Sequence, residues 1–173
     1  GMLGDQNAFS KINLGWITDS RLVVTDSNVT LKLEDFSKNG DTIIIANNWD
    51  VKLGAYQEYY ILAYYKNTGL NSGEAGYFVR DGVVVYHVNA SLYKETIDGE
   101  VYYDIYNSNT DASSEYGTED NLIEYVKNTE HTFTYDVGDS LPTVTDDQGN
   151  TLRYTFTVDA LTADSATLTF TKR

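Results

Sequence analysis

The 173-residue sequence contains no cysteine, only one proline, and no apolar run long enough to cross a membrane as a helix. Without cysteine the chain cannot form disulfides, thiolate zinc sites or a cysteine nucleophile. A spanning helix needs roughly 18 or more consecutive apolar residues, so none is expected, and no secretion signal is evident. This length suits one ordinary domain or two small ones.

The motifs of several common chemistries are also missing. Glycine-rich phosphate and dinucleotide loops are absent. Neither of the two histidines, His87 and His131, has a second histidine three or four residues away, so there is no H-E-x-x-H zinc helix. His87 ends a run of valines, and we interpret it as a hydrogen-bonded core or edge residue. The sequence therefore predicts no catalytic, cofactor-binding or metal-ligating residue.

The segment 138–141 spells the G-D-S-L string of a serine esterase family. A serine nucleophile needs a histidine base, and no histidine follows Leu141. We therefore interpret these residues as a turn. The acidic string 146–150 resembles a calcium loop, but its spacing is not that of an EF-hand, and a hairpin turn explains it equally well.

The chain has 26 acidic and 12 basic residues, which gives a net charge of −14. Such a surface repels phosphate backbones and anionic membranes, so we expect no nucleic-acid partner; the lack of a long apolar run predicts no membrane span. Acidic side chains suit calcium, so calcium is a possible ligand; solubility alone is the alternative explanation.

Fifteen tyrosines and many threonines and valines favour strands, and the predicted fold class is all-β, mainly antiparallel. We expect a two-sheet β-sandwich with one or two short helices. The clearest strands are residues 21–25, 29–33, 42–46, 58–65, 83–88, 101–106, 132–135, 152–158 and 166–171. Asn39-Gly40 and Asp98-Gly99 are good turn signals between them.

The last two strands alternate apolar and polar residues, which predicts a terminal hairpin with Leu152, Tyr154, Phe156 and Val158 facing the core. Helical spacing of apolar residues predicts two short helices, over residues 5–14 and 121–127. The polar loop 107–118 is a candidate boundary between two sub-structures.

Aromatic residues crowd the region from Trp49 to Tyr65, including Tyr56, Tyr59, Tyr60 and Tyr64. Exposed rings of this kind form stacking platforms in sugar-binding modules. The alternative, which we favour, is that the rings fill the core, because alternate residues of a strand must point inward.

Several segments, in order, resemble the immune inhibitor A and gametolysin type of secreted zinc metallopeptidase. The most specific are the S-K-x-x-L-G-W string at residues 10–16 and the Tyr86-His87-Val88 strand; E-Y-Y-I-L at residues 58–62 precedes that strand. The sequence departs from the family pattern at Ala63, where glutamate is usual, and at Asn89, where aspartate is usual.

The resemblance implies that the zinc ligands and the glutamate base lie before Gly1. Residues 1–18 would then be the end of an upstream catalytic domain, and residues 19–173 a β-sandwich C-terminal region. The parent enzyme would use zinc and be secreted, with the upstream domain and a protein or cell-surface substrate as partners. This region itself would be non-catalytic and support the protease fold, substrate presentation or surface attachment. The alternatives are a carbohydrate- or cell-wall-binding module and a passive adhesin or stalk domain.

Overall fold

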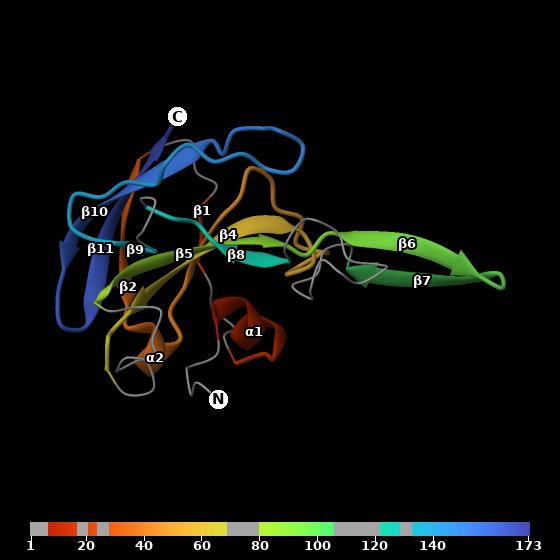
Figure 1. Cartoon of the computed structure of the whole chain (residues 1–173), viewed down its shortest axis with the longest axis horizontal. Helices are drawn as coiled ribbons and strands as arrows, with labels where there is room; N and C mark the ends of the chain where they lie inside the picture. The colour runs from red at the N-terminus through yellow and green to blue at the C-terminus, as the bar shows by residue number, and fades with distance from the viewer. Residues whose placement is uncertain (1–6, 17–20, 24–27, 69–79, 106–121, 129–132) are drawn as a thin grey trace.

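The computed structural model describes the chain except for residues 1–6, 17–20, 24–27, 69–79, 106–121 and 129–132 (Figure 1). Its secondary structure is mostly strand, in agreement with the predicted all-β class. The elements, in chain order, are α1 (Ala8–Asn13), β1 (Arg21–Val23), β2 (Val29–Glu34), α2 (Phe36–Asn39), β3 (Ile43–Ile45), β4 (Glu58–Tyr65), β5 (Gly82–Asn89), β6 (Leu92–Ile97), β7 (Glu100–Ile105), β8 (Ile123–Tyr125), β9 (Thr134–Tyr135), β10 (Tyr154–Leu161) and β11 (Ser165–Lys172).

Two sheets form the predicted sandwich. The larger one has the strand order β1-β3-β4-β5-β8, with β9 also paired to β5, and the smaller one has the order β10-β11-β2. All neighbours are antiparallel except β1 and β3, which run parallel. The terminal hairpin is β10–β11, as the alternating pattern predicts, with a bulge between Val158 and Ala160.

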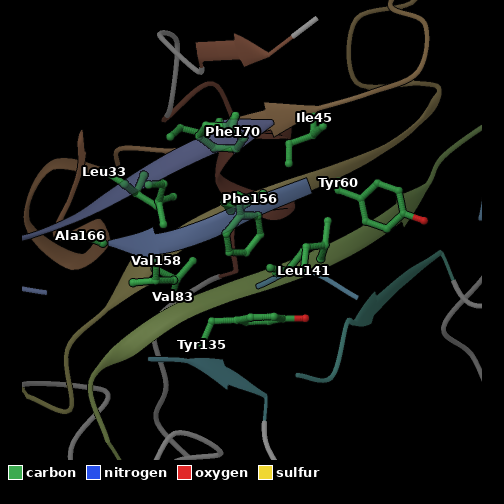
Figure 2. Close-up of a cluster of buried hydrophobic side chains, with 14 of the residues drawn as sticks. Leu33, Ile45, Tyr60, Val83, Tyr135, Leu141, Phe156, Val158, Ala166 and Phe170 are labelled. Carbon is green, nitrogen blue, oxygen red and sulfur yellow. The ribbon is translucent and has the colours of Figure 1, made fainter. Parts of the chain in front are cut away.

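The core between the two sheets is apolar and rich in rings (Figure 2). Phe156 of β10 lies in the middle, with its ring centroid 5.4 Å from that of Tyr135 and 6.0 Å from that of Phe170. The four residues predicted to face inward, Leu152, Tyr154, Phe156 and Val158, are all buried. Burying one such side chain contributes about 1.5–3 kcal/mol, so this layer holds the two sheets together.

The other face of the large sheet is covered as well. Seven of the eight residues of β4 are buried, which explains why its sequence does not alternate. Ala8 and Phe9 of α1 belong to the second buried cluster on this face. The α1 helix starts where the Asn7 side chain accepts a hydrogen bond from the Ser10 amide (2.8 Å). The helix ends at Asn13 with Leu14 as its C-cap, and Gly15, which follows, has a positive φ of 70°.

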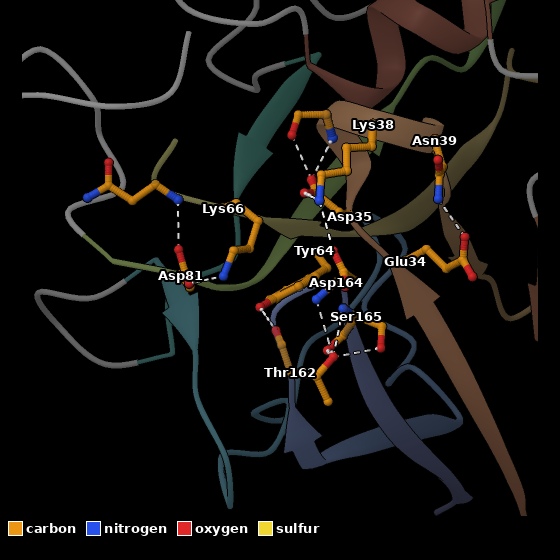
Figure 3. A network of polar contacts seen from close by, with 12 residues as sticks. Glu34, Asp35, Lys38, Asn39, Tyr64, Lys66, Asp81, Thr162, Asp164 and Ser165 are labelled. Carbon is orange, nitrogen blue, oxygen red and sulfur yellow. Dashed lines mark hydrogen bonds and ion pairs between the residues drawn. The ribbon is translucent and has the colours of Figure 1, made fainter. Parts of the chain in front are cut away.

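A polar network closes one edge of the sandwich around α2 (Figure 3). Asp35 is buried and caps α2, accepting hydrogen bonds from the amide and hydroxyl of Ser37. Its own amide donates to the carbonyl of Asp164 in the β10–β11 turn (2.9 Å). The Tyr64 hydroxyl of β4 donates to the carbonyl of Thr162 in the same turn (2.7 Å). The network therefore ties the small sheet to the large one.

The β6–β7 hairpin extends away from the sandwich (Figure 1). Asp98 and Gly99 form its turn with φ values of 53° and 85°, as the Asp-Gly signal predicts. Every residue of β6 is exposed, and so are five of the six of β7. The sequence predicts β7 as a strand over residues 101–106 but predicts no strand over residues 92–97, which form β6.

One predicted helix is wrong. Residues 123–125 of the expected helix 121–127 form β8, whose Tyr125 lies opposite Tyr86 of β5. A helix this short forms few hydrogen bonds of its own, whereas β5 offers a partner strand over residues 86–88, so sheet pairing prevails. The second short helix is α2 instead. Asp5, Asn121 and the candidate boundary loop 107–118 lie outside the described residues.

Candidate functional site

A polar constellation surrounds His87, near the end of β5. In the antiparallel register of β4 and β5, Tyr60 lies opposite His87 and Glu58 lies opposite Asn89. On the other side of β5, His87 lies opposite Glu124 of β8. Three neighbouring strands therefore place an imidazole between two carboxylates. We call Glu58, His87, Glu124 and Asp147 the His87 cluster.

The imidazole of His87 is held from both sides. Its Nε2 is 2.8 Å from Oε1 of Glu58, and its Nδ1 is 3.3 Å from Oε1 of Glu124. The ring also stacks on Tyr60, with centroids 4.8 Å apart and planes 20° apart. Burial lowers the pKa of His87, but hydrogen bonding to Glu58 and Glu124 outweighs this effect, so the pKa is raised. His87 is thus the hydrogen-bonded residue that the sequence predicts.

A loop of the chain covers the cluster. The amide of Asp147 donates to Oε1 of Glu58 (3.0 Å), and the side-chain amide of Asn89 donates to Oδ2 of Asp147. The hydroxyl of Tyr60 donates to the carbonyl of Thr145 (3.1 Å), and burial is the main cause of its raised pKa. These contacts fix the loop over the ends of β4 and β5.

The position of Asn89 explains one departure from the metallopeptidase pattern. Its amide faces the carboxylate of Asp147, and its partner in the strand register is Glu58. An aspartate here would bring a third carboxylate to the same place, whereas the amide can donate a hydrogen bond. Ala63, the other departure, is fully buried beneath the sheet, where a glutamate would need a partner for its charge.

The acidic string 146–150 forms a turn. The carboxylate of Asp146 accepts hydrogen bonds from the amides of Gln148 (3.1 Å) and Asn150 (2.7 Å), and Thr145 bridges Thr151 across the turn. These bonds lower the pKa of Asp146 despite its partial burial. The hairpin-turn interpretation is confirmed, and calcium binding stays a prediction.

The G-D-S-L segment is also a turn. Gly138 has a φ of 89°, and the carboxylate of Asp139 accepts hydrogen bonds from the Asp136 amide (2.7 Å) and the Asn128 side chain (2.6 Å). The hydroxyl of Ser140 bonds to that of Thr157 (2.8 Å). The Ser140 hydroxyl is therefore paired with another hydroxyl and not with a base, which agrees with the interpretation as a turn.

The tyrosine-rich strand belongs to the core. Tyr59, Tyr60, Tyr64 and Tyr65 are each at most 4% exposed. The ring of Trp49 packs edge-on against Tyr59, with centroids 5.3 Å apart. These four tyrosines cannot stack on a sugar. Tyr56 of the same region is 45% exposed, and Tyr102 (50%) and Tyr103 (66%) on the hairpin are exposed as well; these last two lie in the predicted strand 101–106, which follows the Asp98-Gly99 turn signal.

Two shallow depressions flank the His87 cluster. One, of about 510 Å³, is lined by Tyr60, His87, Glu124 and Asp147 among others. The second, of about 220 Å³, has Glu58 and Tyr60 in its wall. Solvent and small ions therefore have access to the cluster.

Comparisons with protein-family models, with curated proteins and with solved structures find no match to this chain. No helix in the described ranges is long and apolar enough to span a membrane.

Proposed function

We propose that this chain is the non-catalytic, C-terminal β-sandwich region of a secreted zinc metallopeptidase. In this proposal the zinc ligands and the glutamate base belong to a domain that precedes Gly1 in the full-length protein. There a zinc-bound water would attack the peptide bond, with the glutamate as base. The region described here would support the fold of that domain, present its substrate or attach the enzyme to a surface.

The proposal rests on the positions in the fold of the segments that resemble the metallopeptidase family. E-Y-Y-I-L is β4 and the Y-H-V strand is β5, two central strands that pair along their whole length. The S-K-x-x-L-G-W string begins within α1, and Ala8 and Phe9, which directly precede the string, pack in the same buried cluster as residues of β4. The resemblance therefore concerns segments that mostly pack together in one unit, which supports a role for this region in holding the protease fold.

The hairpin suits a supporting role. A two-stranded hairpin is marginally stable alone, and gains stability when another surface covers it. Leu92, Tyr93, Val101, Tyr102 and Tyr103 of this hairpin are exposed. In our proposal the upstream catalytic domain is the surface against which they pack.

The test begins with the encoding gene. We expect an H-E-x-x-H sequence upstream of the codon for Gly1, and its absence would refute the metallopeptidase assignment. The isolated 173-residue protein should not cleave casein in the presence of Zn²⁺, whereas the full-length protein should. Peptidase activity of the isolated protein would refute its supporting role.

A binding module is the second candidate, favoured by the exposed tyrosines of the hairpin. Aromatic faces stack on sugars, and two tyrosines of the hairpin lie on the same face. Tyr102 is paired with Glu95, which is two residues from Tyr93 on β6, so the side chains of Tyr93 and Tyr102 are diagonal neighbours. This candidate predicts retention on an insoluble cell-wall or glycan matrix that a Tyr93→Ala/Tyr102→Ala variant loses. The matched variant Tyr56→Ala, an exposed tyrosine outside the hairpin, should be retained like the unmodified protein.

A further inference from the structure

We propose that Glu58, His87 and Asp147 bind one divalent transition-metal ion of the Zn²⁺ type. One ligand atom from each residue lies within 4.8 Å of the other two. The three residues come from β4, from β5 and from the loop that covers them, so the tertiary fold brings the donors together. Metal–ligand distances near 2 Å place donor atoms about 3–4 Å apart, so small side-chain rotations suffice to close the site.

The donor set selects the class of metal. One imidazole nitrogen and two carboxylate oxygens suit Zn²⁺ and similar borderline ions. Calcium prefers an all-oxygen shell of six or more ligands, which this set does not supply. The ion would take the place of the proton between Nε2 of His87 and Oε1 of Glu58.

The surroundings of the three residues match those of a metal site. The second nitrogen of His87, Nδ1, faces the carboxylate of Glu124 at 3.3 Å. A ligating histidine commonly donates its other N–H to a carboxylate, which fixes the ring and its tautomer. Glu58 is oriented by the Asp147 amide, and Asp147 by the side chain of Asn89. Each of the three ligands thus has a partner that orients it.

Charge and access support the site as well. Three carboxylates face one imidazole, so a divalent cation reduces the repulsion among them. The open depression beside His87, Glu124 and Asp147 leaves a path for the ion and room for water at the remaining coordination position.

Titration with ZnCl₂ tests the proposal, using protein without a polyhistidine tag and isothermal calorimetry. We expect one ion per chain and a higher melting temperature with Zn²⁺. Asp147→Asn and His87→Gln should each weaken binding at least about tenfold. Asp147 is exposed, so the Asp147→Asn variant should fold even if the His87→Gln variant does not. The matched control is His131→Gln, which removes the only other histidine and should bind like the unmodified protein.

Binding of paramagnetic Co²⁺ identifies the histidine ligand. Bound Co²⁺ should shift the ring protons of one histidine in the ¹H NMR spectrum, and the shifted signals should vanish in His87→Gln and persist in His131→Gln. Absence of saturable Zn²⁺ binding up to about 1 mM would overturn the proposal. Equal binding by the Asp147→Asn variant would overturn it too. Neither result bears on peptidase activity, so the test is independent of the function proposed above.

Discussion

Tyr60 and His87 face each other across β4 and β5, and their rings stack with centroids 4.8 Å apart. The stack joins the apolar interior to the polar end of the sandwich. On its inner side Tyr60 belongs to the core between the sheets, and on its outer side His87 meets Glu58 and Glu124. The hydroxyl of Tyr60 then reaches the loop that supplies Asp147.

Tyr60→Phe should destabilise the protein by about 0.5–1.5 kcal/mol. The change leaves the carbonyl of Thr145 without the hydrogen bond from the Tyr60 hydroxyl and preserves the ring stack. Urea unfolding followed by fluorescence measures the loss. Tyr102→Phe, in the exposed hairpin, is the control and should change stability by less than about 0.5 kcal/mol. Equal stability of the Tyr60 variant and the unmodified protein would show that the bond contributes nothing.

Phe156→Ala should cost about 3–5 kcal/mol, because the ring is fully buried between the sheets and its loss leaves a cavity. Chemical unfolding gives the value. Tyr103→Ala also removes an aromatic ring from a strand, but from one that is 66% exposed, and should cost far less. Similar losses for the two variants would mean that the hairpin contributes to the core as much as β10 does.

Gly82→Ala should destabilise the edge of the large sheet by about 1–3 kcal/mol. A Cβ at this position would lie 2.9 Å from Cβ of Thr134 and 3.1 Å from the carbonyl of Tyr135, so β9 would have to shift. Faster hydrogen exchange of the β9 amides should accompany the loss of stability. In the control Gly54→Ala no atom lies within 4 Å of the new Cβ, so only the strain of its positive φ remains. Unchanged exchange in β9 would contradict the predicted clash.

The pair formed by Lys66 and Asp81 should make stability depend on acid pH (Figure 3). Burial raises the pKa of Asp81, but hydrogen bonds from Lys66 and from the Asn67 amide outweigh it, and the pKa is lowered. A lowered carboxylate pKa gives stability that is present above the unfolded value of about 3.9 and is lost as the pH falls through the folded value. The stability difference between the unmodified protein and Asp81→Asn should therefore be constant near neutral pH and shrink below about pH 4.

Unfolding in urea at several pH values checks this dependence. The pair is partly exposed, so the difference at neutral pH should be modest, as for most surface ion pairs. Lys66→Gln is the matched variant, because it removes the main hydrogen-bond donor to Asp81 and should reduce the same dependence. A difference that grows as the pH falls would have the wrong sign and contradict the assignment.

Local signals predicted the strands well and the short helices less well. Alternation in residues 152–158 and the Asp-Gly turn are encoded in neighbouring residues, and both appear in the structure as expected. Residues 123–125 have helical spacing of apolar side chains, yet they pair with β5, because a strand edge from another part of the chain was available. The sequence does not predict the strand β6, because its residues are exposed on both faces and no inward-facing pattern marks it.

By itself, the sequence determined the all-β class, the central valine and tyrosine strands, and the turns at Asp98, Gly138 and Asp146, because backbone preference and side-chain period act over a few residues. Tertiary structure decided what surrounds His87. Glu58 and Glu124 are 29 and 37 positions away along the chain, and only the register of three strands brings their carboxylates to one imidazole. A register shift of one residue would turn His87 to the opposite face of the sheet, so the cluster depends on long-range pairing that local sequence patterns do not specify.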